Sequence, residues 1–292
     1  MRYATWHQKQ GWKAEEYFED NKVIALCHAI EKKDLVEMQR LIDAGADVNA
    51  RGKGNMTPLL WAYPDNQVPR FKLLLENGAD PNVLFESDFA NKKGWESGLR
   101  PGDSITHMVC MTSFPGYFEA VFDNGGDPNL VGGTEETTIE TPIFKLIDRG
   151  GTVAQLKELV ELGANIEHVN SMNNTPLFNA IVSNKFGLAL ELVRLGADYK
   201  YYKANTNVKA IHYVAKANER IPVIGSEQDR QNLSDLIEWL EAHGESLSDA
   251  EADMARWASW YKDGDIRGAY QKKQAEVRAR KLREAREKQQ ND

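Results

Sequence analysis

Cysteine, long apolar runs and clustered metal ligands are scarce in this sequence of 292 residues. Its two cysteines, Cys27 and Cys110, are too few for a disulfide framework, and both lie in apolar stretches that predict buried thiols. No run approaches the roughly 18 apolar residues of a membrane span, and the first residues do not form a signal peptide. The expected location is the cytoplasm, with the periplasm as the alternative if a leader peptide has been removed.

Catalytic and metal-binding motifs are also missing. The six histidines are scattered along the chain, at His7, His28, His107, His168, His212 and His243. None is paired with a cysteine or a carboxylate at a recognised metal-ligand spacing. The glycine pairs at 125–126 and 132–133 lack the lysine and the strand–loop–helix frame of a phosphate-binding loop. We therefore expect no metal, no cofactor and no enzymatic activity; an enzyme site built from loop insertions is the alternative.

The charge of the chain narrows the choice of partner. The net charge is -8 at pH 7, from 44 acidic and 36 basic residues. An acidic surface repels nucleic acid and anionic membranes, so neither is an expected partner. A basic protein suits this charge better. Because 41% of the residues are apolar, the chain can also bury a substantial core.

The most informative feature of the sequence is a repeat. Gly-Ala-Asp or a close variant begins at Gly45, Gly78, Gly125, Gly163 and Gly196, with spacings of 33, 47, 38 and 33 residues. A second landmark, Thr-Pro or its equivalent, begins at Thr57, Ser104, Thr141, Thr175 and Lys209, with spacings of 47, 37, 34 and 34 residues. The two landmarks agree on a unit of about 33 residues. The longer gaps contain insertions.

Local rules predict two short helices in each unit. Threonine caps the first helix, and proline suits its first position because no amide hydrogen is needed there. The second helix is apolar on one face, as in 71–77, and ends at a glycine that tolerates a left-handed conformation. The Asp and Asn residues that follow favour a tight turn, because their side chains hydrogen-bond to nearby backbone. The expected unit is helix, turn, helix and hairpin.

This pattern resembles the ankyrin repeat. The resemblance covers about residues 22–246 and gives six units, whose second helices end at Gly45, Gly78, Gly125, Gly163, Gly196 and Gly244. His107 and His212 match the histidine of the family's Thr-Pro-Leu-His motif, which implies a structural hydrogen bond for each; Leu60, Phe144 and Phe178 replace it elsewhere. The expected fold is an all-α ankyrin-repeat solenoid of about six helix-turn-helix units with short β-hairpin fingers and capping helices at both ends.

The repeats are expected to be sealed and interrupted. The predicted layout is an N-terminal cap (1–21), a repeat domain (22–246) with insertions at about 85–102 and 219–232, a C-terminal capping helix (247–270) and a charged tail (271–292). Phe89 and Trp95 in the first insertion either fold back onto the repeats or are presented for binding. The second insertion is expected to interrupt the last helix pair. The tail carries eight basic and four acidic residues, which predicts a solvated helix or disorder.

Aromatic residues lie at both ends of the repeat region. Those expected to cover the first helix pair are Trp6, Trp12, Tyr17 and Phe18. At the other end, Ser248 and Glu251 form a capping-box signature for a closing helix whose buried face would hold Met254, Trp257, Ala258 and Tyr261. A binding patch made of Trp257, Trp260 and Tyr261 is the alternative interpretation.

The resemblance implies a curved stack with a concave face formed by the finger tips and the first helices. Arg, Trp and Tyr are the residue types that most often anchor interfaces. The predicted partner-binding residues are Arg51, Lys53, Trp61, Asp65, Trp95, Arg149, Tyr201 and Tyr202.

Six repeats offer more than the roughly 800 Å² per partner that a standard stable interface buries. The resemblance therefore implies a non-enzymatic protein-binding scaffold. The irregular units are similar to those of bacterial members of the family, some of which resemble immunity proteins. The specific hypothesis is an immunity or inhibitor protein that neutralises a bacterial toxin or effector. A host-directed or regulatory adaptor that tethers without inhibiting is the alternative. Sealed ends favour a monomer.

Overall fold

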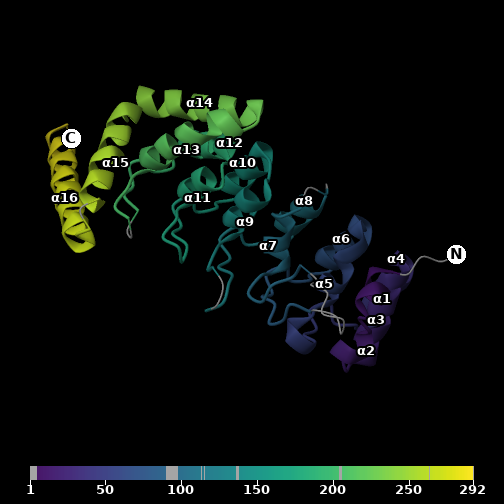
Figure 1. Ribbon diagram of the computed structural model, residues 1–292. Coiled ribbons are helices and arrows are strands. Elements are labelled where there is room, and N and C mark those ends of the chain that lie inside the picture. The colour runs from purple at the N-terminus through teal and green to yellow at the C-terminus, as the bar shows by residue number, and fades with distance from the viewer. Residues whose placement is uncertain are drawn as a thin grey trace. The chain divides into compact units, whose positions relative to one another are not determined.

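The computed structural model describes residues 5–89, 98–112, 114, 116–135, 138–203, 206–262 and 264–291. The contacts between residues divide the chain into two compact units, Met1–Ser171 and Met172–Asp292 (Figure 1). Helices dominate the described residues. Their β-structure consists of one isolated antiparallel bridge, between Gly132 and Glu140. No helix among the described residues combines the length and the apolar character needed to cross a membrane.

The first unit consists of two short helices followed by helix pairs. Its helices are α1 (Trp6–Gln10), α2 (Ala14–Tyr17), α3 (Asn21–Lys32), α4 (Leu35–Asp43), α5 (Pro58–Ala62), α6 (Val68–Glu76), α7 (Ile105–Val109), α8 (Tyr117–Phe122), α9 (Pro142–Arg149) and α10 (Val153–Glu161), with 3-10 turns η1 (Lys53–Asn55) and η2 (Pro64–Asn66). The pairs are α3 with α4, α5 with α6, α7 with α8, and α9 with α10.

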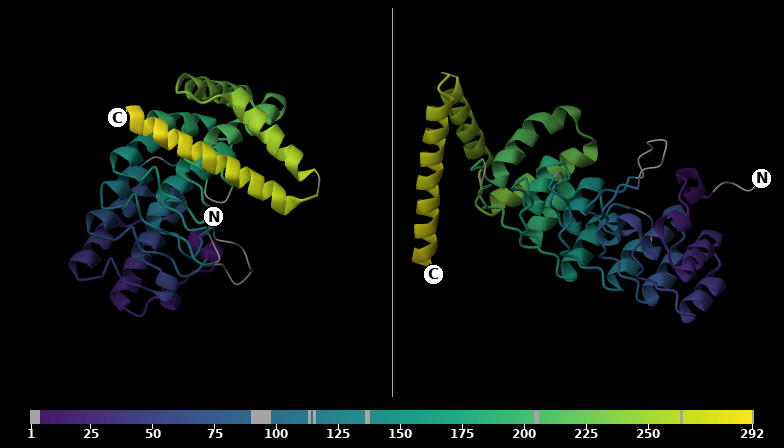
Figure 2. Two further views of the ribbon diagram at one scale, coloured as in Figure 1. Left: turned by 90° about the vertical axis from the view of Figure 1, so that its left-hand side faces the viewer. Right: turned by 90° about the horizontal axis from the view of Figure 1, so that it is seen from below.

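The second unit continues the pairing and then departs from it. Its helices are α11 (Pro176–Val182), α12 (Phe186–Arg194), α13 (Ala210–Ile224), α14 (Glu227–Ala242), α15 (Leu247–Tyr261) and α16 (Ile266–Asn291). Helices α11 with α12 and α13 with α14 complete the six predicted pairs. Helices α15 and α16 follow as the two arms of a helical hairpin (Figure 2).

The threonine that precedes the first helix of a repeat caps that helix, as predicted, at two of the three Thr-Pro pairs. The Thr57 side chain accepts a hydrogen bond from the Leu60 amide at 3.0 Å, and Thr175 caps α11 in the same way. The Thr141 hydroxyl makes no such bond to α9. Each second helix is followed by a glycine with a φ between 83° and 98°, a left-handed conformation that favours glycine: Gly45, Gly78, Gly125, Gly163, Gly196 and Gly244.

Asparagines after the Gly-Ala-Asp motifs link neighbouring repeats of the first unit. The Asn49 side chain donates to the Gly78 carbonyl at 2.8 Å and accepts from the Asp80 amide at 2.7 Å. Asn82 makes the same two contacts with Gly125 and Asp127, and Asn129 makes them with Gly163 and Asn165. The period of the repeat is therefore visible in the hydrogen bonds between fingers as well as in the helices.

The N-terminal segment packs farther along the chain than the first helix pair. The His7 ring hydrogen-bonds to the Trp61 carbonyl at 2.8 Å, and the Trp12 indole donates to the Phe89 carbonyl at 3.2 Å. Trp12, Trp61 and Phe89 are all buried, and the Trp12 ring contacts the rings of the other two. Phe89 thus folds back onto the repeats, as one interpretation of the first insertion predicted. Trp95 lies outside the described residues.

Two details near the C-terminus differ from the sequence prediction. The second insertion does not form a loop, because α13 continues to Ile224 and α14 begins at Glu227. The Ser226 side chain caps α14 by accepting from the Asp229 amide at 3.1 Å, so both helices are simply longer. The closing helix α15 is capped by Ser246 rather than Ser248, because it begins two residues earlier than the capping-box signature indicated.

Candidate functional site

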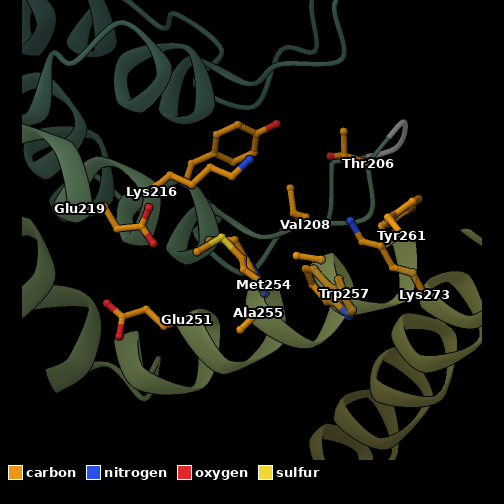
Figure 3. A pocket seen from close by; sticks show the side chains of 13 residues that line it. Thr206, Val208, Lys216, Glu219, Glu251, Met254, Ala255, Trp257, Tyr261 and Lys273 are labelled. Atoms are coloured by element: carbon orange, nitrogen blue, oxygen red, sulfur yellow. The ribbon is translucent and has the colours of Figure 1, made fainter. Parts of the chain in front are cut away.

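A groove lies between α13 and α15 in the second unit. It has a volume of about 490 Å³, and Figure 3 shows the side chains that line it. Helix α13 supplies residues at helical spacing, including Tyr213, Lys216 and Glu219. Lys273 of α16, with Thr206 and Val208 from the segment before α13, completes the lining. Helices α13, α15 and α16 and the segment before α13 therefore line one open site.

The floor of the groove is apolar and centred on Trp257. This side chain is 5% exposed and stacks on the His212 ring, with the ring centroids 5.0 Å apart. Met254 is half-buried beside it, and Figure 3 shows Met254 and Trp257 along the middle of the groove. Tyr261 lies farther along α15 and is 38% exposed. Aromatic and thioether groups of this kind are typical anchors for an apolar ligand or a partner side chain.

Four charged side chains surround this floor. Glu219 and Glu251 lie at one end, and Lys273 lies toward the other (Figure 3). The Lys273 ammonium is 4.3 Å from the centre of the Trp257 ring. Burial and the nearby charge of Lys216 lower the pKa of Lys273. The groove therefore has an acidic end, an apolar middle and two lysines in mutual repulsion.

Ion pairs hold α16 against the rest of the unit. The Arg280 guanidinium lies 2.5 Å from the Asp253 carboxylate, and Arg256 contacts both Asp253 and Glu276. Burial opposes the ionisation of Asp253, yet the hydrogen bonds from Arg280 and Arg256 outweigh it and keep the pKa of this carboxyl below its ordinary value.

A second group of contacts attaches α16 to the last finger. Lys209 is buried and lies 2.9 Å from Glu245 and 3.5 Å from Glu284. The Tyr202 hydroxyl donates to Glu284 at 3.1 Å, and the Lys281 ammonium is 4.6 Å from the centre of the Tyr202 ring. Tyr202 is therefore occupied by the C-terminal helix.

His212 is held as a neutral ring below the floor. Its Nδ1 accepts from the Lys209 amide at 3.2 Å, so the proton is on Nε2, which faces the Asp253 carboxylate at 3.5 Å. Burial lowers the pKa of His212 to about 4, against the smaller opposing effect of Asp253. His107 in the first unit also has a pKa lowered by burial to about 4, and its ring contacts the Ser104 hydroxyl at 2.9 Å. Both histidines are packed as structural groups.

The described residues contain no group of three or more His, Cys, Asp or Glu side chains placed to hold a metal ion. Cys27 and Cys110 are both buried, and burial raises the pKa of each thiol well above its ordinary value. A thiol with a raised pKa is a poor nucleophile.

Comparison with known proteins identifies the architecture. No protein-family model matches the chain. An ankyrin repeat protein of fowlpox virus (strain NVSL) is 32% identical over 89 residues, which cover 30% of this chain and 12% of the viral protein. The ankyrin repeat domain of Bcl-3, a member of the IkappaB protein family, superimposes with a TM-score of 0.52 at 19% identity, over 76% of this chain and 86% of that one. An ankyrin repeat domain from Acinetobacter baumannii AYE gives a TM-score of 0.55 at 18% identity, over 72% of this chain and 95% of that one.

The chain has the ankyrin-repeat fold. The predicted fold class, an all-α ankyrin-repeat solenoid, is confirmed by these likenesses and by the six helix pairs. Because the chain spans only about an eighth of the viral relative, nothing about the activity of that whole protein follows for this one.

The predicted partner-binding residues of the first compact unit, Met1–Ser171, differ in how exposed their side chains are. Arg51, Lys53 and Arg149 are exposed. Trp61 has no exposed surface, so its prediction as a direct contact is wrong. The N-terminal aromatic segment covers it. The backbone of Asp65 is part of η2, but its side chain lies outside the described part, as does all of Trp95.

In the second unit both predicted tyrosines are half-buried. Tyr201 packs edge-on against Phe178, with ring centroids 6.0 Å apart, and Tyr202 is bound to α16. Of the alternative patch proposed for α15, Trp257 and Tyr261 line the groove and Trp260 does not.

The sequence prediction missed the charged residues of the groove. Lys216 and Glu219 lie three residues apart on α13, so they share a face. The spacing of Glu251, Met254 and Ala258 on α15 gives a second such face. Only the packing of α13 against α15 brings the two faces together, and no local signal in the sequence states that contact.

Proposed function

We propose that this chain is a non-enzymatic scaffold that binds a protein partner, and that the groove between α13 and α15 is one of its contact surfaces. The observation that carries the proposal is the combination of an apolar floor at Met254 and Trp257 with surrounding charges that make no ion pair within the described residues. Protein interfaces combine buried aromatic anchors with a polar rim in this way. The exposed residues Arg51, Lys53 and Arg149 remain proposed contacts in the first unit.

The finer proposal is that binding inhibits the partner. The net charge of -8 suits a basic toxin or effector, because complementary charge speeds association and suppresses wrong partners. In this version the chain is an immunity protein that neutralises a bacterial toxin. An adaptor with the same fold would bind its partner and leave its activity unchanged.

Affinity capture from the native cell, followed by an activity assay on the captured partner, tests both versions. A stoichiometric protein partner that loses activity on binding supports inhibition. A partner that keeps full activity contradicts inhibition and favours tethering. Recovery of no protein after chemical cross-linking in the cell contradicts the binding function itself.

A further inference from the structure

The two lysines of the groove lack the carboxylate partners that neighbouring basic residues have. In the same unit Lys209, Arg256 and Arg280 each lie within 4 Å of an acidic side chain. Neither Lys216 nor Lys273 has a carboxylate at that distance among the described residues, although Lys273 is half-buried. A half-buried cation without a counter-charge is costly. An acidic group placed between the two ammonium groups would remove that cost.

Both lysines line the groove, and Lys216 is near enough for its charge to act on Lys273. Lys216 comes from α13 and Lys273 from α16, and Figure 3 shows the two side chains extending toward the same part of the groove. Each ammonium also lies over an aromatic ring, Lys216 at 5.9 Å from the centre of Tyr213 and Lys273 at 4.3 Å from the centre of Trp257. These rings restrict the lysines and leave their charges directed at the groove.

The end of the groove away from Lys273 has the reverse polarity (Figure 3). Glu219 of α13 and Glu251 of α15 face the same cavity, and neither lies within 4 Å of a basic side chain in the described structure. A basic side chain would be attracted there. Met254, with Trp257 beyond it, lies between this end and Lys273 (Figure 3).

We infer that the groove binds a short segment of a protein partner that carries an acidic side chain, then an apolar side chain, then a basic side chain. This inference rests on the proposed binding function and names the chemistry of the partner at this site. The acidic side chain lies between Lys216 and Lys273, the apolar one packs on Met254 and Trp257, and the basic one reaches Glu219 and Glu251. A nucleic acid fits poorly, because its phosphates would meet the two glutamates.

The test uses the full chain and a library of short random peptides displayed on phage. The wild-type chain should enrich peptides in which an acidic residue and a basic residue flank an apolar one. Lys216→Glu/Lys273→Glu should reverse the preference at the first position from acidic to basic, and Lys216→Gln/Lys273→Gln should abolish it. The control Lys32→Glu/Lys200→Glu makes the same change in net charge at exposed lysines outside the groove, and should select the same peptides as the wild type.

The outcomes separate this inference from the binding function. Enrichment of no peptide family by the wild type overturns the inference, and so does a family that both groove variants bind unchanged. If the cellular partner is still captured in either case, the chain is a binding protein that uses another surface. Circular dichroism of each variant confirms that a lost preference does not come from unfolding.

Discussion

At the scale of single residues, burial decides what a charged side chain contributes to stability. Arg70 is 1% exposed, and its guanidinium donates to three backbone carbonyls, among them Ile30 at 2.9 Å and Ala62 at 3.1 Å. Arg70→Met removes one buried hydrogen-bond donor from each of these carbonyls and should lower the free energy of unfolding by about 3 kcal/mol or more. The Arg51 side chain is 42% exposed and lies 3.3 Å from Asp80. Arg51→Ala should therefore lower the free energy of unfolding by less than about 1 kcal/mol.

Urea denaturation of the two variants measures this difference. The matched arginines lie in the same unit, so both report on the same unfolding transition. Equal losses from Arg70→Met and Arg51→Ala would contradict the structural role assigned to Arg70.

The buried histidines predict a loss of stability in mild acid. The pKa of His212 falls from an ordinary 6.5 to about 4 in the folded chain, so the unfolded chain binds a proton first as the pH drops. The contribution of neutral His212 to the free energy of unfolding is complete above pH 6.5 and is lost as the pH falls toward 4. The loss amounts to roughly 2 kcal/mol between pH 7 and pH 5. His212→Gln removes this titration, so unfolding free energies at the two pH values should lie closer together than in the wild type. An unchanged pH dependence would show that His212 has the same pKa in the folded and the unfolded chain.

At the scale of elements, the repeat helices could be predicted from the sequence because their signals are local. A capping threonine, a proline at the first position and a closing glycine each act on the backbone within a few residues of themselves, as at Thr57, Pro58 and Gly78. The structure of the second insertion was harder to predict, because Ser226 starts a new helix in a segment expected to be irregular. Local rules therefore gave the pairs and missed the length of α13 and α14.

Helix α16 could not be placed from sequence because the groups that hold it come from distant positions. Apart from Ala269 and Val277, its described residues are half-buried or exposed, and its contacts are mainly ionic. The pairing of Arg280 with Asp253 joins residues on two different helices. A count of basic residues shows that such a tail is charged, but not which carboxylates it meets.

The ionic attachment of α16 predicts that it detaches before the repeats unfold. Arg280→Ala leaves Asp253 with a weaker set of partners and removes one of the links to α15. Amide hydrogen exchange within 266–284 should rise at least about tenfold in this variant, while exchange in α12 stays close to that of the wild type. High salt should act in the same direction on the wild type, because it screens exposed ion pairs. Uniformly faster exchange throughout the second unit would mean that α16 is part of a single cooperative core.

At the scale of the whole molecule, a repeat architecture confines the loss of stability caused by a substitution to the repeats next to it. Trp61 is fully buried against Trp12 and the His7 ring. Trp61→Ala should cost about 3–5 kcal/mol through the cavity that it leaves. Because stability in repeat proteins is approximately a sum over adjacent interfaces, hydrogen exchange should accelerate within Met1–Ser171 and change little in α13 to α15. Equal acceleration in both units would contradict this separation.

The candidate site could be predicted from the sequence only in part. Residue type suggested Arg51, Arg149 and the tyrosines as contacts, and exposure supports the arginines as candidates. The same reasoning failed for Trp61, because a tryptophan is as suitable for a core as for an interface. The groove depends on helices packed side by side, and that arrangement is a property of the assembled chain.

The most direct test of the account is quantitative affinity capture of the cellular partner with the wild-type chain and with Lys216→Glu/Lys273→Glu. If the groove is a contact surface of a protein-binding scaffold, the wild type should recover a defined partner and the variant at least about tenfold less, which corresponds to about 1.4 kcal/mol of binding free energy. Equal recovery by the two chains, or no partner recovered by either, would contradict the account.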